Sequence, residues 1–259
     1  MSYSLITGAS KGIGKAIAFE LALRKNDLLL VARSEDLLKQ IAKEIQAKFS
    51  VKVAYFATDL AAFDAAEKVK NFCEKNNLDI NILVNNAGYG LNGSFENLAI
   101  SEQLNMMQLN MTSLVHLCHA FLPMLKKQNK AYILNVSSTT AYQAIPFMSL
   151  YAASKAFVLS FSRGLKLELK KTSVSVTCLV PGSTATDFSN RAGISEELVK
   201  KGENVTMTSE AVAKIAIDGM FAEKTEIIPG FVNKIGAFFP RFLPKSLPEK
   251  IAAGLYEVK

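Results

Sequence analysis

The stretch YSLITGASKGIGKAIA at residues 3–18 decides the fold. A short apolar run leads into Gly8, Gly12 and Gly14, and a segment of helical period follows at once. Glycines let the backbone turn tightly and approach a pyrophosphate, and the first N–H groups of the following helix attract its negative charge. A purely structural turn is the alternative, because the spacing differs from the common Gly-x-Gly-x-x-Gly. The strand before the loop and the helix after it favour a dinucleotide site.

Downstream of this loop, short apolar runs alternate with longer segments of helical period. This alternation is typical of βαβ units, whose strands are buried on both faces of a parallel sheet. The predicted strands are residues 3–6, 28–32, 52–56, 80–84, 132–136, 174–179 and 226–228. The predicted helices are residues 14–24, 36–48, 61–76, 102–128, 150–171 and 209–222. We expect an α/β fold in a single domain over residues 1–259, a doubly wound Rossmann-type parallel sheet of about seven strands with helices on both faces.

The end of the second predicted strand indicates which dinucleotide binds. In NAD sites an acidic residue at this point binds the ribose 2′-hydroxyl, but here the strand ends with Arg33. A guanidinium suits a 2′-phosphate, and Lys11 in the glycine loop adds a second cation. In the alternative, Arg33 only caps the sheet, Lys11 is solvated, and Glu35 or Asp36 reaches the ribose. The pattern favours NADPH over NADH.

Tyr151 and Lys155 lie four residues apart in a predicted helix and therefore share one face. An ordinary tyrosine pKa of about 10 is too high for proton transfer near neutrality, and a fixed ammonium favours the phenolate. Ser138 follows a predicted strand, at the edge where doubly wound sheets bind ligands, and its hydroxyl can donate to a carbonyl oxygen. Each signal has a plain alternative. Most Tyr-x-x-x-Lys pairs have no role, and Ser138, like Ser137, suits a turn.

Taken in order, these motifs resemble those of the short-chain dehydrogenase/reductases. The resemblance extends from residue 4 to about residue 228. It includes Asp59-Leu60, Asn85-Asn86-Ala87-Gly88, Leu109-Asn110, Ser138, and Pro181-Gly182 with Thr186. It implies that Tyr151 is the general acid/base and that Lys155 lowers its pKa and holds the nicotinamide ribose. It further implies that Ser138 donates to the substrate oxygen and that Asn110 holds a proton-relay water.

The resemblance and the glycine loop together define a set of expected cofactor contacts. Residues 59 and 60 would border the adenine, and the loop from residue 181 to residue 186 would contact the nicotinamide amide. The expected contacts are Gly8, Ser10, Lys11, Gly12, Ile13, Gly14, Arg33, Asp59, Leu60, Asn86, Ala87, Gly88, Tyr151, Lys155, Pro181, Gly182, Thr184 and Thr186.

Two segments depart from the regular pattern. Residues 188–207 stand where the family places a variable substrate lid. Residues 229–259 extend the chain past the usual end of 3-oxoacyl-carrier-protein reductases, so the tail resembles hydroxysteroid and long-chain ketoacyl reductases more closely. Prolines 240, 244 and 248 break any long helix in this tail, which could cover a pocket, join a subunit interface or rest on a membrane. Membrane contact would use Phe238, Phe239, Phe242 and Leu243 with Lys234, Arg241 and Lys245.

Composition excludes several classes of protein. The 259 residues carry 30 Lys plus Arg and 23 Asp plus Glu, but both signs are interleaved, which argues against a nucleic-acid partner. Cys73, Cys118 and Cys178 are too few and too far apart for a disulfide framework or a zinc site, and suit a reducing cytoplasm. His116 and His119 have no carboxylate beside them and indicate packing, so no metal is expected. The first residues do not resemble a signal peptide, and no apolar run is long enough to span a bilayer.

We therefore expect a cytoplasmic NADPH-dependent oxidoreductase that reversibly reduces a ketone or 3-oxoacyl carbonyl on a mainly apolar small molecule. A secondary alcohol would be the product. A homodimer or homotetramer is expected from the resemblance. The alternative, from another class of protein, is a catalytically idle dinucleotide-binding regulator or scaffold that keeps the fold.

Overall fold

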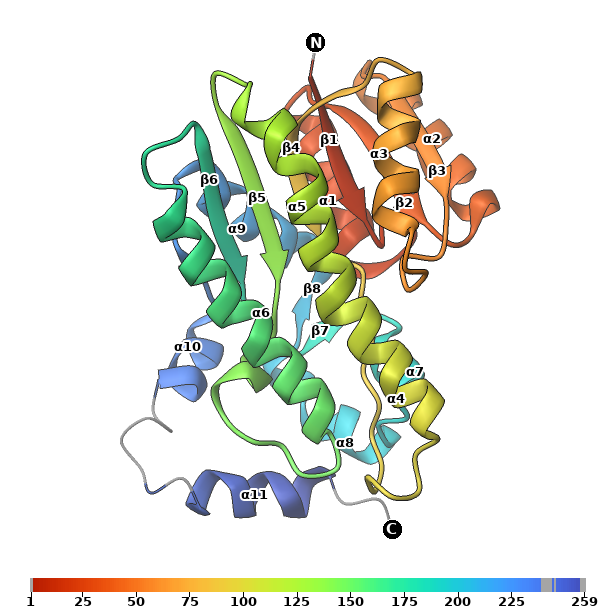
Figure 1. Cartoon of the computed structure of the whole chain (residues 1–259). Coiled ribbons are helices and arrows are strands. Elements are labelled where there is room, and N and C mark those ends of the chain that lie inside the picture. Colours follow the sequence, from red (N-terminus) through yellow and green to blue (C-terminus); the bar gives the residue numbers. More distant parts are fainter. Residues whose placement is uncertain (1, 239–243, 245, 257–259) are drawn as a thin grey trace.

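A seven-stranded parallel sheet forms the centre of the computed structural model, which describes residues 2–238, 244 and 246–256 (Figure 1). The strands lie in the order β3-β2-β1-β4-β5-β6-β9, and every neighbouring pair is parallel. They are β1 (Ser2–Thr7), β2 (Asp27–Ala32), β3 (Val53–Ala57), β4 (Asp79–Asn85), β5 (Ala131–Val136), β6 (Val174–Leu179) and β9 (Glu226–Ile227). This confirms the predicted doubly wound sheet, whose order reverses between β1 and β4.

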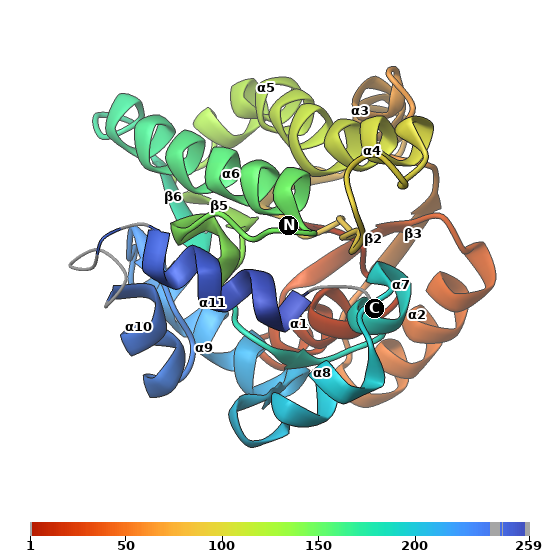
Figure 2. The same cartoon turned by 90° about the horizontal axis from the view of Figure 1, so that it is seen from below.

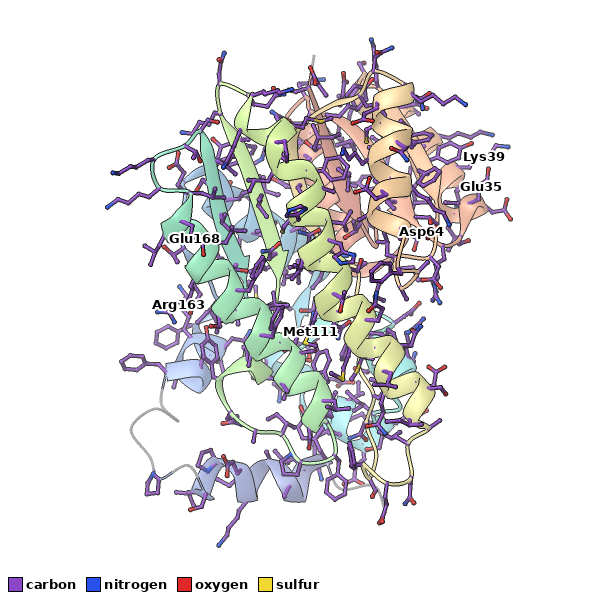
Figure 3. All side chains as sticks on the ribbon, viewed as in Figure 1. Glu35, Lys39, Asp64, Met111, Arg163 and Glu168 are labelled. Atoms are coloured by element: carbon purple, nitrogen blue, oxygen red, sulfur yellow. The ribbon has the colours of Figure 1, made fainter. Side chains whose placement is uncertain are left out.

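Helices cover both faces of the sheet, as Figure 2 shows from below. One face carries α3 (Ala65–Lys75), α5 (Ser113–Lys126) and α6 (Ser149–Glu168), and the other carries α1 (Gly12–Leu23), α2 (Glu35–Phe49) and α9 (Ser209–Phe221). Successive strand residues point to opposite faces, so Leu5 packs into one core and Ile6 into the other, and both are fully buried. The outer faces are charged, as Glu35 and Lys39 on α2 and Glu168 on α6 illustrate (Figure 3).

The predicted helix at 61–76 begins only at Ala65. Asp59 explains the delay, because its carboxylate accepts a hydrogen bond from the Ala61 N–H at 3.0 Å and holds the chain in a turn.

The predicted single helix at 102–128 is interrupted. It consists of α4 (Ile100–Met107), a π-helical turn at Gln108–Thr112, and α5. Met111, in the π-turn, lies where this helix faces α6 (Figure 3).

The carboxyl ends of the strands carry smaller elements. These are a 3₁₀ turn (Thr139–Tyr142), β7 (Thr184–Ala185), α7 (Phe188–Ala192), α8 (Glu196–Lys201), a 3₁₀ turn (Glu203–Val205) and β8 (Met207–Thr208). Strands β7 and β8 pair in parallel and bracket the predicted lid segment 188–207. In the tail, α10 (Phe231–Phe238) and α11 (Ser246–Tyr256) are two separate short helices. Pro248 lies in the first turn of α11, where a helix tolerates proline.

Candidate active site

A cavity of about 1130 Å³ opens at the carboxyl ends of the strands. Its volume lies just above the range of about 300–1,000 Å³ typical of small-molecule sites, so it has room for a dinucleotide and a second ligand. Every predicted site residue except Gly14 and Asn110 lines this cavity. The structure therefore brings together residues from the glycine loop, from the ends of five further strands and from one helix.

The glycine loop forms the floor of the cavity. Gly8 and Gly12 have φ angles of +64° and +52°, which favour glycine, and a Cβ at Gly8 would lie 2.7 Å from the amide nitrogen of Asn86. The Thr7 hydroxyl accepts hydrogen bonds from the N–H groups of Asn86 and Ala87 at 2.9 and 3.1 Å and donates one to Val84 at 3.1 Å. These contacts hold the loop rigidly against β4. A bare, rigid backbone at the start of α1 fits a pyrophosphate.

Gly14 supports this loop from behind instead of lining the cavity. A Cβ at Gly14 would lie 2.3 Å from the Gly8 carbonyl oxygen, so only glycine lets α1 pack this closely against the loop. This close packing is the role of the third glycine in dinucleotide-binding turns.

The residues that follow β2 and β3 line another part of the cavity. Arg33 and Asp59 belong to its wall, whereas Glu35 and Asp36 do not. Figure 3 shows Glu35 on the outer side of α2.

Lys11 also lines the cavity, but its ammonium pairs with the Asp187 carboxylate at 2.7 Å. This ion pair joins the glycine loop to the start of the lid. The pair is largely exposed, so it contributes about 0–1 kcal/mol, and an anion bound in the cavity can compete for Lys11.

Tyr151 and Lys155 project from one face of α6 into the cavity, and each is 6% exposed. The Lys155 ammonium lies 5.7 Å from the Tyr151 ring centroid and donates to the Val136 carbonyl oxygen at 3.0 Å. Ser137 fixes the helix to β5, because its hydroxyl donates to the Lys155 carbonyl at 2.7 Å. The predicted pair therefore meets at the end of β5, beside Ser138.

Burial sets the charge states of these two groups. It raises the pKa of Tyr151 well above its usual 10, although a hydrogen bond with Ser138 acts in the opposite direction. Burial also lowers the pKa of Lys155 to about 8. Near neutral pH the phenol of Tyr151 is therefore protonated and can donate a proton. The pKa of the neighbouring Lys155 ammonium lies close to the same pH.

Asn110 lies in the π-turn behind the cavity wall. Its amide nitrogen donates to the Tyr89 carbonyl at 2.9 Å and to the Ser154 hydroxyl at 3.2 Å, and its oxygen accepts the Tyr89 N–H at 3.1 Å. A Cβ on Gly88 would lie 2.8 Å from the Asn110 oxygen and 3.4 Å from the Lys155 nitrogen. The geometry thus shows Asn110 holding the backbone at residue 89, while its role with a water remains a prediction.

Several wall residues were not predicted from the sequence as site residues. Tyr89, Met148 and Ile194 line the part of the cavity near Tyr151, together with Phe188, whose ring centroid lies 5.3 Å from that of Tyr151. Other unpredicted wall residues are Arg191, whose guanidinium lies 4.2 Å from the Tyr89 ring centroid, and Tyr256 from α11. The predicted lid gave a signal for residues 188, 191 and 194, but no motif marked residue 256.

Within residues 2–238, 244 and 246–256, no three His, Cys, Asp or Glu residues lie close enough together to hold a metal ion. His116 packs edge-on against Phe63 at 5.2 Å. Burial raises the pKa of Cys73, Cys118 and Cys178 to about 12.

Among the described helices, none has the length and hydropathy needed to cross a membrane.

A glycine-floored cavity with a buried tyrosine and lysine on its wall defines a dinucleotide-dependent oxidoreductase. Comparison with known proteins gives the family. A family model for short chain dehydrogenases matches residues 3–197. The chain belongs to the short-chain dehydrogenase/reductase family, which acts on CH–OH and C=O groups with an NAD(P) cofactor.

The relatives agree with this assignment. The chain is 32% identical over 236 residues to 17-beta-hydroxysteroid dehydrogenase type 3 of Mus musculus, covering 90% of this chain and 76% of that protein. It is 30% identical over 246 residues to the very-long-chain 3-oxoacyl-CoA reductase of Mus musculus, covering 93% and 76%. In eight of the curated relatives, the match spans 58% to 78% of the relative's length. A solved short-chain dehydrogenase from Sphingobium yanoikuyae in complex with NADPH superposes with a TM-score of 0.83 at 29% identity, covering 100% of this chain and 97% of that one.

Proposed function

We propose that this protein uses NADPH to reduce a ketone or 3-oxoacyl carbonyl on a mainly apolar substrate, reversibly, to a secondary alcohol. The observation that carries the proposal is the buried Tyr151 beside Lys155 and Ser138 on the cavity wall. The wall near Tyr151 is largely apolar, with Met148 and Phe188. Relatives named for hydroxysteroid and long-chain 3-oxoacyl substrates support the same substrate class.

In this proposal each side chain has one task. The bound nicotinamide supplies the hydride. Tyr151 donates its phenolic proton to the carbonyl oxygen as negative charge develops there, and the Ser138 hydroxyl stabilises that charge. Lys155, held by the Val136 carbonyl, keeps a positive charge near the phenol and stabilises the phenolate that remains after the proton has been donated. The rigid loop at Gly8 and Gly12 holds the pyrophosphate.

The direct test is NADPH consumption by the wild-type protein across ketones, aldehydes, a steroid and a long-chain 3-oxoacyl thioester. We expect turnover of at least one apolar ketone or 3-oxoacyl compound. Tight NADPH binding without turnover of any carbonyl would favour the idle regulator instead.

The preference for NADPH is a separate proposal that depends on Arg33. Its guanidinium lines the cavity where no acidic residue of α2 does, which supports binding of a 2′-phosphate. For Arg33→Ala, we expect the KM for NADPH to rise about 10–100-fold, as for loss of a charge-assisted hydrogen bond, with little change for NADH. Initial rates with each cofactor measure both values. Equal losses with NADPH and NADH would contradict the assignment.

We also propose weak contact of the tail with a membrane surface. Apolar side chains are exposed on α10, with Phe231 at 77%, and on α11, where Leu247, Ile251 and Leu255 follow one helical stripe. Lys234 and Lys250 lie among them and suit anionic headgroups. Of the residues predicted to make this contact, Lys234 and Phe238 are exposed, and 239, 241–243 and 245 lie outside the described residues.

Vesicle co-sedimentation tests this contact. We expect binding to anionic vesicles that falls about tenfold in Phe231→Asp, because a buried aromatic side chain contributes about 1.5–3 kcal/mol. Phe63→Asp is a matched control, because Phe63 is equally exposed but lies just before α3, outside the tail. Equal sedimentation of both variants would contradict the contact. A homo-oligomer and a cytoplasmic location remain predictions.

A further inference from the structure

The C-terminal helix α11 contributes Tyr256 to the wall of the cavity. Its Ala252 is 3% exposed and packs in a cluster with Tyr89, Met148 and Tyr151, and Tyr256 packs against the same cluster. The Asn92 amide donates to the Tyr256 carbonyl at 3.2 Å and fixes the end of the helix. This helix lies beyond residue 197, where the match to the family model ends. The wall that it forms therefore lies outside the part of the chain that the family model matches.

Tyr256 brings a second phenol into the cavity. Both Tyr256 and Tyr151 line the cavity, and they are close enough that Tyr256 contributes to the raised pKa of Tyr151. Burial also raises the pKa of Tyr256, so its hydroxyl stays protonated and can donate a hydrogen bond. Within the described part of the chain, no protein group accepts that hydrogen bond.

The surroundings of this phenol limit what it can bind. Met148, Phe188 and Ile194 supply apolar surface to the cavity near Tyr151. A half-buried hydroxyl in such a wall gains most from an oxygen on the ligand, because a polar group without a partner there is costly. A ligand whose carbonyl contacts Tyr151 then has its second oxygen at a distance set by the two phenols.

We propose that Tyr256 is a specificity-determining residue that donates a hydrogen bond to a second oxygen of the substrate. The substrate class is then an apolar ketone that carries a hydroxyl or oxo group away from the reacting carbonyl. This inference rests on the proposed carbonyl reduction. It adds a second polar contact, supplied by the C-terminal helix.

A series of straight-chain hydroxyketones tests the inference, with the hydroxyl placed at increasing distance from the carbonyl and the parent ketone as reference. For the wild-type protein, we expect one spacing to give a kcat/KM about tenfold above that of the parent ketone. In Tyr256→Phe, the ratio of hydroxyketone to parent ketone is expected to fall to about 1 at every spacing. Tyr55→Phe removes a hydroxyl from β3, outside the cavity wall, and is expected to keep the wild-type ratio.

A second variant tests the placement of the phenol. Asn92→Ala removes the hydrogen bond that holds the Tyr256 carbonyl, so we expect a smaller preference at the same spacing. A wild-type protein without preference for any hydroxyketone, or an unchanged ratio in Tyr256→Phe, would overturn the inference.

The two proposals fail in different ways. Absence of turnover with every ketone contradicts the proposed function. In that case, binding of the same compounds to the NADPH-loaded protein decides the inference. Quenching of the nicotinamide fluorescence measures this binding. Tighter binding of one hydroxyketone that Tyr256→Phe removes would support the contact, and equal binding of hydroxyketone and parent ketone would overturn it.

Discussion

Replacing Tyr151 with phenylalanine is expected to lower kcat for carbonyl reduction by about 10²–10⁴-fold, the range for loss of a general acid. Phenylalanine keeps the ring that packs against Phe188 and the apolar cluster around Met148, so the cavity keeps its shape. Only the proton donor and the hydrogen bond with Ser138 are lost. Initial rates with the best substrate of the wild-type protein, at saturating NADPH, measure the effect.

Two controls accompany this variant. Thermal unfolding and NADPH titration of Tyr151→Phe establish that the fold and the cofactor site persist. Tyr55→Phe controls for loss of a phenol elsewhere, on β3. Activity of Tyr151→Phe within tenfold of the wild-type value would show that another group, or water, delivers the proton.

Replacing Lys155 with methionine is expected to lower kcat/KM by about 10²–10³-fold and, at the same time, to stabilise the fold. Burial lowers the pKa of this lysine from 10.5 to about 8, which corresponds to a cost of about 3 kcal/mol for keeping it charged in the folded protein at pH 7. Methionine fills a similar volume without the charge. The free energy of unfolding at pH 7 is therefore expected to rise by about 1–3 kcal/mol, after allowing for the lost hydrogen bond to Val136.

The pH dependence gives this prediction a sign. Between pH 8 and 10.5 the unfolded wild-type chain binds the proton that folded Lys155 has lost, so this lysine makes stability rise with pH over that range. The stability advantage of Lys155→Met is therefore expected to shrink between pH 7 and pH 9.5. Urea unfolding of both proteins at the two pH values measures it. An advantage that stays constant with pH, or a less stable variant at pH 7, would contradict the burial of a charged lysine.

The sheet and the phosphate loop were predictable because their signals are local. An apolar run, three glycines and a helical pattern occupy residues 3–18, and each reports on a few neighbouring residues. The paired residues 151 and 155 are also local, since one helical turn places them together. These signals gave strand positions within one or two residues and nearly all of the cofactor half of the cavity wall.

The substrate half depends on contacts between distant parts of the chain. Tyr256 reaches the cavity only because α11 packs on residues 89 and 151, more than a hundred positions earlier. No periodicity within residues 246–256 indicates where that helix will dock. The sequence also gave no sign that Lys11 pairs with Asp187, because an ion pair across 176 positions leaves no local pattern.

The π-turn at Gln108–Thr112 has a consequence for the rotational phase of the helix that contains it. Each α-helical residue turns the chain by about 100°, and a π-turn accommodates one residue more than an α-turn. The apolar stripe of α4 is therefore offset around the helix axis from that of α5, which lets α4 face α6 while α5 faces α3 and β4. Deleting one residue here would restore a regular helix only by rotating one half against the other. Asn110 would then leave its contacts with Tyr89 and Ser154, so the extra residue sets the angle of this wall of the site.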